Sequence, residues 1–208
     1  MTRTVDARRR LALIGGTVAS ALLLWPSPAE AHLVTTGLGP IYDGISHVLM
    51  SPDDLVPILA MAFLAGLNGP VAGRRTLFAL TAAWLVGGAA GFYSGQPLIP
   101  GAASALSFLA LGGLTAADKR LSPRIVTALA AVVGMLHGWL NGAGIAESQR
   151  ELLGLVGIAS VVFVLVALAS AFVVSLRAGW TRIAVRVAGS WIAAIGLLML
   201  GWNLRGAV

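Results

Sequence analysis

Residues 152–176 read LLGLVGIASVVFVLVALASAFVVSL, an apolar run that contains no charged side chain. The run exceeds the ~20 residues that a helix needs to cross the hydrocarbon core of a bilayer. Similar runs occupy approximately residues 53–69, 76–93, 98–117, 124–142 and 183–204. The sequence therefore predicts an all-α membrane protein, built as a bundle of about six transmembrane helices.

The composition supports this fold class and limits the chemistry that the chain can perform. Hydrophobic residues make up 58% of the sequence and charged residues 11%, well below the roughly 25% charge of soluble domains. The absence of cysteine excludes disulfides, iron–sulfur clusters and thiolate metal sites. The net charge of +6 comes from basic residues near the N-terminus and in short loops, so we expect a lipid bilayer, and no nucleic acid, as partner.

The N-terminus has the three parts of a secretory signal peptide. Three arginines precede a short apolar run, and Ala29-Glu30-Ala31 then forms a small-x-small cleavage pattern. The sequence thus predicts a signal peptide over residues 1–31. The mature chain would begin at His32 and form a single six-helix transmembrane domain, residues 32–208.

The loops between the spans differ in charge. With the mature N-terminus outside, only Arg150 and Arg205 lie on the outer side, and the positive-inside rule is satisfied. Residues 32–52 are too short and too rich in glycine to span, so we expect an outer or re-entrant segment. The basic residues of the predicted inner loops are Arg74, Arg75, Lys119, Arg120, Arg124, Arg177, Arg182 and Arg186.

Two of the predicted helices carry glycine at every fourth position. Small residues on one helix face allow backbones to approach closely in lipid. We interpret both patterns as packing surfaces, and the shaping of a substrate pathway is the alternative. The patterns are Gly87-x3-Gly91-x3-Gly95 and Gly134-x3-Gly138-x3-Gly142.

All three histidines of the chain fall on the predicted outer side. His47 follows Asp43 by four residues, and Asn141 follows His137 by four, which places each pair on one face of a helix. Polar side chains at membrane depth usually face the bundle interior and contact a partner, ion or substrate. Imidazole and carboxylate are suitable metal ligands in a chain without cysteine. We therefore expect a divalent-metal site, with ordinary hydrogen bonds as the structural alternative.

The remaining candidate ligands lie near these histidines in the sequence. Ser51-Pro52-Asp53-Asp54 has a capping serine, a first-turn proline and two acids, so both acids are either helix-start residues or ligands. His32 would combine its imidazole with the α-amine that cleavage frees. We expect His47 and His137 to come close together in the fold. The predicted metal ligands are His32, Asp43, His47, Asp53, Asp54 and His137.

These motifs resemble those of the HupE/UreJ family of bacterial membrane proteins, which is associated with nickel supply to hydrogenase and urease. That family has a cleaved signal peptide, six helices, an early histidine-x5-Asp-His-Leu motif and a later His-Gly pair. Here His47-x5-Asp53-Asp54-Leu55 has the same spacing, and His137-Gly138 resembles the later pair. Two features differ, since Asp54 replaces the second histidine and no proline follows His47.

The resemblance implies a permease or uptake accessory for a divalent transition metal in the bacterial inner membrane, with a periplasmic mature N-terminus. Nickel is the expected ion, although a carboxylate in place of imidazole makes the site harder and leaves cobalt, zinc, manganese and copper open. The chain has no P-loop, so any transport would be secondary, channel-like or driven by a partner. Asn68 is one of few polar residues in the inner halves of the spans, so the sequence does not reveal where an ion would leave.

Two other functions remain open at this point. One is a non-transporting metal-binding or scaffold protein that hands the ion to a membrane partner, with a homo-oligomer as a further possibility. The other is an intramembrane hydrolase that pairs Ser94 or Ser104 with His137. Neither H-E-x-x-H nor G-x-S-x-G occurs in the chain, and we expect that the protein is not an enzyme.

Overall fold

The computed structural model describes residues 36–96, 101–148 and 151–205. These residues are largely α-helical and contain no β-strand, which confirms the predicted fold class. The chain divides into a short unit, Met1–His32, and a larger unit, Leu33–Val208, that contains every described residue. The predicted signal peptide and His32 lie outside the described residues.

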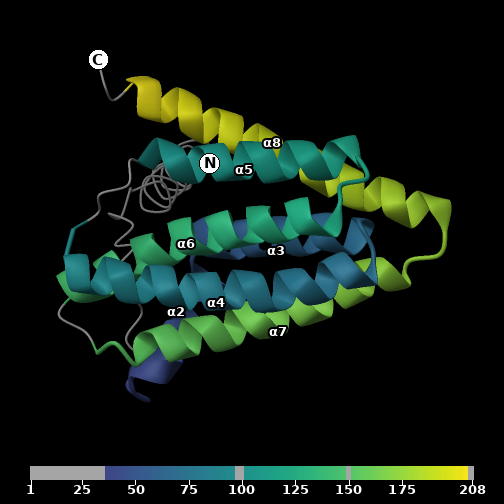
Figure 1. Ribbon diagram of the computed structural model, residues 1–208. Coiled ribbons are helices and arrows are strands. Elements are labelled where there is room, and N and C mark those ends of the chain that lie inside the picture. Colours follow the sequence, from purple (N-terminus) through teal and green to yellow (C-terminus); the bar gives the residue numbers. More distant parts are fainter. Residues whose placement is uncertain (1–35, 97–100, 149–150, 206–208) are drawn as a thin grey trace, which may run out of the picture. The chain divides into compact units, whose positions relative to one another are not determined.

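The described residues form seven helices, labelled in Figure 1. The six predicted spans correspond to α3 through α8, with ends that differ by at most six residues. An additional helix, α2, occupies part of the predicted outer or re-entrant segment. The bounds are α2 Pro40–Met50, α3 Pro52–Leu67, α4 Pro70–Ser94, α5 Gly101–Ala117, α6 Pro123–Glu147, α7 Gly154–Ser175 and α8 Gly179–Arg205.

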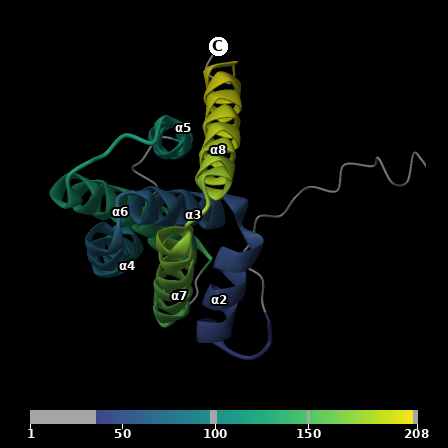
Figure 2. The same ribbon diagram turned by 90° about the vertical axis from the view of Figure 1, so that its right-hand side faces the viewer.

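The helices differ in their capacity to cross a bilayer. α4, α6, α7 and α8 are each long and apolar enough to do so alone. The 17 residues of α5 rise only about 25 Å at ~1.5 Å per residue, which is short of the ~30 Å hydrocarbon core. α2 and α3 qualify only as a pair, with a bend of 74° between them (Figure 2). The bundle thus combines four long helices, one short helix and one bent pair.

The bend between α2 and α3 lies at Ser51. A proline occupies the first turn of α3, where its missing N–H costs no helical hydrogen bond. Ser51 holds the N-cap position as predicted, but its hydroxyl makes no capping hydrogen bond. That hydroxyl lies 3.3 Å from Nδ1 of His47 instead. The predicted helix start is right in position and wrong in the role of the serine.

Glycines bring α4 and α6 into direct backbone contact, so the two predicted packing surfaces face one another. Gly95 is the exception, because it ends α4 in a left-handed conformation with φ 62° and has nothing within 4 Å of its Cβ position. At the other five positions a Cβ would lie within 3 Å of a backbone oxygen of the facing helix, so only glycine fits. These positions are Gly87, Gly91, Gly134, Gly138 and Gly142.

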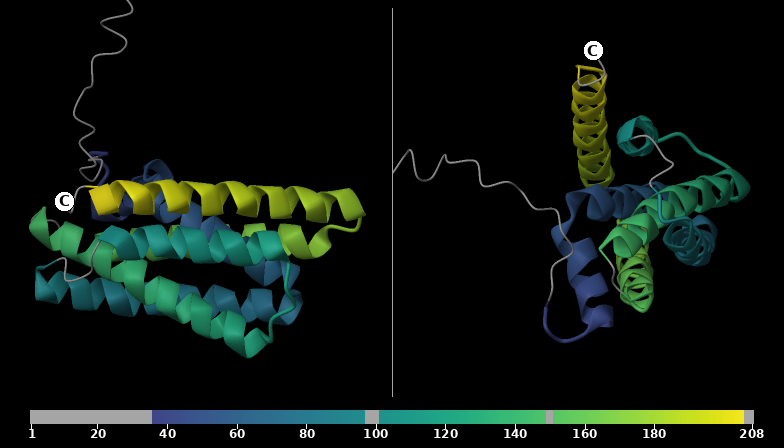
Figure 3. Two further views of the ribbon diagram at one scale, coloured as in Figure 1. Left: turned by 90° about the horizontal axis from the view of Figure 1, so that it is seen from above. Right: turned by 90° about the vertical axis from the view of Figure 1, so that its left-hand side faces the viewer.

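A second close pair consists of α5 and α8, which lie side by side in Figures 1 and 3. A Cβ added at Gly112, Gly189 or Gly196 would come within 3 Å of the backbone of the other helix. This pair contacts the other helices chiefly through α3. The bundle therefore contains two tightly joined helix pairs that meet at α3.

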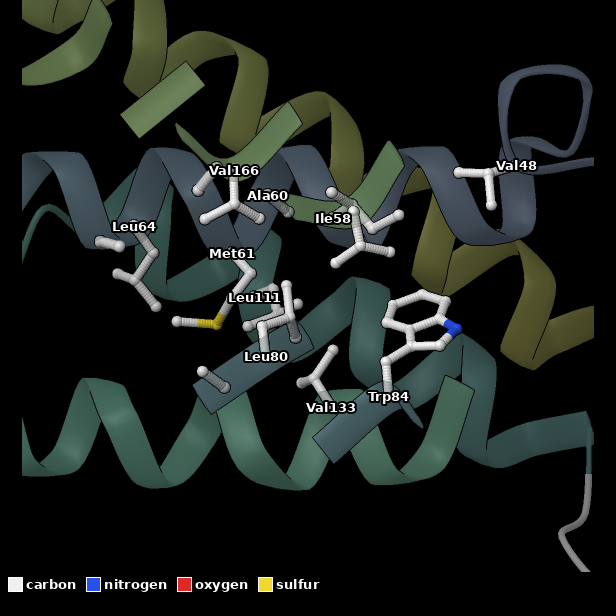
Figure 4. Packing of buried hydrophobic residues seen from close by; sticks show 14 of the residues in the cluster. Val48, Ile58, Ala60, Met61, Leu64, Leu80, Trp84, Leu111, Val133 and Val166 are labelled. Carbon is white, nitrogen blue, oxygen red and sulfur yellow. The ribbon is translucent and has the colours of Figure 1, made fainter. Parts of the chain in front are cut away.

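The helix α3 is the centre of the bundle and contacts every other described helix. Ten of its 16 residues are buried. Figure 4 shows Ile58, Met61 and Leu64 of α3 packed among side chains from neighbouring helices, including Leu80 and Trp84 of α4. Because α3 is central, the acidic residues of its first turn begin a buried helix rather than a surface helix.

Candidate metal site

Asp54 lies in the first turn of α3, and only 5% of its surface is exposed. Three side chains from α2 and α6 contact its carboxylate oxygens. A buried carboxylate would be costly without such partners. We call the four residues His47, Asp54, His137 and Asn141 the Asp54 cluster.

His47 reaches the carboxylate from α2. The bend between α2 and α3 folds the two helices toward one another, and Nε2 of His47 lies 3.2 Å from Oδ2 of Asp54. The other ring nitrogen, Nδ1, faces the Ser51 hydroxyl at 3.3 Å. Since a hydroxyl can either donate or accept, His47 can present either ring tautomer to the carboxylate.

His137 reaches the same carboxylate from α6. Its Nδ1 lies 3.6 Å from Oδ1 of Asp54, and only 1% of the residue is exposed. The imidazole stacks on the indole of Trp84, with ring centroids 5.6 Å apart and an interplanar angle of 25°. The expectation that His47 and His137 come together is confirmed, because both rings contact one carboxylate.

Ser107 on α5 contacts the other ring nitrogen of His137. Its hydroxyl lies 2.7 Å from the carbonyl oxygen of Ser104, to which it can donate, and 2.9 Å from Nε2 of His137. When the hydroxyl proton is used in the first contact, Nε2–H donates in the second, and Nδ1 of the neutral ring is an acceptor that faces Asp54. In the other tautomer the hydroxyl donates to Nε2, and Nδ1–H faces the carboxylate. In the first tautomer the contact between Nδ1 and Asp54 is favourable only when a proton or a cation joins the two atoms.

Asn141 lies one helical turn after His137 and is also buried. Its Nδ2 is 3.0 Å from each of the two Asp54 oxygens. Its Oδ1 is buried and accepts no hydrogen bond from the described residues. The indole Nε1 of Trp84 is likewise buried without a partner in this part of the chain. The region thus contains one unsatisfied acceptor and one unsatisfied donor.

The other predicted ligands lie elsewhere. Asp43 accepts hydrogen bonds through Oδ1 from the backbone N–H of Thr36 at 2.6 Å and from the Thr36 hydroxyl at 2.7 Å. Asp53 is exposed in the first turn of α3, next to the buried Asp54. The structure therefore brings together three of the six predicted ligands, His47, Asp54 and His137. His32 lies outside the described residues.

Ser107, His137 and Asp54 follow one another in the order of a serine hydrolase triad. The sequence suggested Ser94 or Ser104 as the serine, but Ser107 is the one beside the ring. Its hydroxyl also lies 2.7 Å from the Ser104 carbonyl oxygen, so the carbonyl and the imidazole compete for one proton.

The cluster is not a preformed metal-binding group. In the part of the chain that the structure describes, no three or more His, Cys, Asp or Glu side chains are placed to hold one ion together. The two imidazoles approach different oxygens of Asp54, and the amide of Asn141 lies against both oxygens. An ion can bind among these groups only if it replaces some of these contacts.

The opposite end of the bundle, where α3, α5 and α7 end and α4, α6 and α8 begin, is held by different polar contacts. We call it the basic end because the predicted inner loops lie there. Arg182 of α8 donates to both oxygens of Asp118, at 2.6 and 2.7 Å, and to the carbonyl oxygen of Leu67 at 3.4 Å. Asn68 accepts from the backbone N–H of Leu121 at 2.7 Å. These contacts join the ends of α3 and α5 to the start of α8.

The fold and the buried cluster define a multi-pass helical membrane protein with imidazole and carboxylate groups inside the bundle. The family described as HupE / UreJ protein matches residues 20–199, so this chain belongs to the HupE/UreJ family, and the predicted resemblance is confirmed. Membership places it among membrane transport and accessory proteins and supports a general role in metal uptake. Searches of curated proteins and of solved structures gave no match.

Sequence reasoning missed Ser107 and Trp84 as neighbours of His137. Ser107 stands in a predicted apolar span on α5, and its only signal was a hydroxyl within a hydrophobic run. Trp84 is one of six tryptophans in the chain, and nothing in the sequence distinguishes it, although the structure buries it beside His137. Both contacts depend on how three helices pack, which the spacing within any one helix does not reveal.

Proposed function

We propose that this protein is a permease or uptake accessory for a divalent transition metal in the bacterial inner membrane. The observation that carries the proposal is one buried carboxylate, Asp54, contacted by two imidazoles inside a bundle of membrane helices. Ionisable groups at such depth are expensive and typically mark ion pathways. The family match supports a metal as the ion.

The donor atoms of the Asp54 cluster suit a borderline cation. Imidazole nitrogen binds nickel, cobalt, zinc and copper, and carboxylate oxygen extends the range to manganese. The separations of the His47 and His137 nitrogens from the carboxylate oxygens are 3.2 and 3.6 Å. Neighbouring ligands of a tetrahedral ion with bonds of about 2.0–2.1 Å are about 3.3 Å apart, so small side-chain shifts would admit an ion. Among these cations, we expect nickel to be the substrate.

The distribution of charge supports a direction of uptake. The basic loops would lie in the cytoplasm, so the Asp54 cluster would lie toward the periplasm. The ion would meet Asp43 before it reaches the cluster. In a permease the ion would leave at the basic end, and the Arg182 contacts there would have to open. In the accessory alternative the ion passes to a membrane partner, and the basic end stays closed.

Purified protein in proteoliposomes tests the proposal. Nickel, cobalt, zinc, manganese and copper are offered singly outside, and bound and internal metal are measured separately. Saturable uptake that Asp54→Asn abolishes supports the permease, and binding without uptake supports the accessory. Asp53→Asn is the matched control, because it removes the same charge at the adjacent exposed position. Absence of both binding and uptake for every cation would show that the proposal is wrong.

A further inference from the structure

The strongest unexplained feature of the molecule is the side-chain oxygen of Asn141. The residue is 8% exposed, and its Oδ1 accepts no hydrogen bond from any described residue. A buried acceptor left without a partner destabilises the fold, because its desolvation is not compensated. Reversing the amide would not relieve it, because Oδ1 would then face the two oxygens of Asp54 that Nδ2 now contacts. Without an ion, the contacts of Nδ2 with Asp54 set the orientation of the amide and leave Oδ1 without a partner among the described residues.

A second acceptor lies on the same face of α6. Residues four apart on a helix are neighbours, so the side chains of His137 and Asn141 lie next to one another. Nδ1 of His137 lies 3.6 Å from Oδ1 of Asp54, and in the tautomer with its proton on Nε2 it offers a lone pair toward that oxygen. One carboxylate thus lies beside an amide whose oxygen is unsatisfied among the described residues and beside an imidazole that can offer a nitrogen lone pair. A divalent cation can bind all three groups at once.

We propose that Asn141 is a ligand of the metal substrate and binds it through Oδ1, together with Nδ1 of His137 and the carboxylate of Asp54. This inference rests on the function proposed above and extends its ligand set to a residue with no charge. The ion would replace the Nδ2 contacts of Asn141 with Asp54, and the amide would turn its oxygen toward the ion. The site then offers imidazole nitrogen, carboxylate oxygen and amide oxygen, a mixture typical of first-row divalent cations.

The rival explanation gives Asn141 a purely structural role as a hydrogen-bond donor to Asp54. The two roles make opposite demands on Asn141→Asp. An aspartate cannot donate to Asp54 and adds a like charge beside it, so a structural donor role predicts a loss larger than that of Asn141→Leu. A ligand role predicts that Asn141→Asp keeps or raises the affinity for Ni²⁺, whereas Asn141→Leu lowers it by about 10–100-fold.

A transposed pair keeps the test decisive if the single aspartate variant does not insert. The double variant Asp54→Asn/Asn141→Asp retains one carboxylate, one amide and the hydrogen bond between them. If both positions are ligands, the double variant recovers Ni²⁺ binding to within about 10-fold of the wild type. If Asp54 alone is a ligand, the double variant binds as poorly as Asp54→Asn, and the inference is overturned.

The measurement is titration of detergent-purified protein with Ni²⁺, and with Co²⁺ and Zn²⁺ in parallel, on fractions that elute as folded protein. Failure of the wild type to bind any of the three ions would refute the proposed function and this inference with it. A wild type that binds, combined with a double variant that stays at the level of Asp54→Asn, would refute the Asn141 ligand alone. The two failures are therefore distinguishable.

Discussion

Two polar groups connect helices at opposite ends of this bundle, and they differ in how completely their atoms are paired. At the basic end, Arg182 and Asp118 form a bidentate ion pair, and the arginine also donates to a helix-end carbonyl oxygen. In the Asp54 cluster, the partners of the carboxylate among the described residues are two imidazoles and an amide, and the Asn141 oxygen accepts no hydrogen bond from these residues. The first group is complete without a ligand. The second has bonding capacity left for an ion.

The largest effect on stability should come from a change that disrupts the backbone contact between α4 and α6, next to the Asp54 cluster. A Cβ at Gly142 would lie 1.9 Å from the carbonyl oxygen of Gly88. Gly142→Ala should therefore force α6 away from α4, at or above the upper end of the roughly 1–3 kcal/mol that overpacking costs. We expect a clear fall in the thermal unfolding temperature in detergent and in the yield of inserted protein.

Gly144→Ala is the matched control on the same helix, because nothing lies within 4 Å of its Cβ position. That variant should be as stable as the wild type or more stable by roughly 0.5–1 kcal/mol, since alanine is the better helix former. Equal losses in Gly142→Ala and Gly144→Ala would show that the backbone contact between α4 and α6 does not hold the cluster in place.

Next in size is the effect of Asp54→Asn on metal affinity. The change keeps the shape of the side chain and removes the one negative charge of the cluster. A divalent cation in a buried site depends on that charge, so the loss should exceed the 10–100-fold that removal of an outer-shell partner typically causes. Direct metal titration measures it. Asp53→Asn, at the exposed neighbouring position, should change the affinity little. An equal loss in both variants would indicate general charge attraction instead of ligation.

A smaller effect is expected at Ser107, which contacts His137 but not Asp54 in the interactions described above. Ser107→Ala removes the hydroxyl partner of Nε2, so the imidazole loses a contact that orients its ring. We expect metal affinity to fall by about 10-fold, and Ser107→Thr, which keeps the hydroxyl, to restore most of it. A loss in the threonine variant equal to that in the alanine variant would indicate a packing defect rather than a lost hydrogen bond.

The smallest effect on metal binding should follow from Arg182→Gln. The arginine side chain is 47% exposed, so its pair with Asp118 should contribute about 1 kcal/mol or less to stability. We expect a slightly lower unfolding temperature and an unchanged metal affinity in detergent. The charge-reversed double variant Asp118→Arg/Arg182→Asp should recover part of the stability. If Arg182→Gln alone abolished metal binding, the contrast between the two ends of the bundle would fail.

The sequence was sufficient for the parts of this structure that depend on one helix at a time. Apolar runs predicted α3 to α8, and glycine spacing predicted a packing surface on α4 and another on α6. The residue types and spacings also selected His47, Asp54 and His137 as candidate ligands, and these three side chains do meet. These predictions succeed because burial in lipid constrains each helix separately.

The features that the sequence did not predict depend on how the helices pack against one another. Asp53 and Asp54 look equivalent in the sequence, but the rotation of α3 exposes the first and buries the second. Ser107 became a neighbour of His137 only because α5 packs beside α6 at that level. The signal peptide and the ligand role of His32 stay predictions, since both concern residues outside the described part of the chain.

The corner between α2 and α3 gives the spacing of the histidine motif a meaning that the sequence alone conceals. His47 and Asp54 are seven residues apart. In one straight helix they would share a face, but they would stand about 10 Å apart along the axis. The turn of 74° at Ser51 shortens that span, and the two side chains touch at 3.2 Å. The spacing of seven residues therefore brings the two side chains into contact only because the chain bends between them. A change in the number of residues or in the bend angle would separate His47 from Asp54.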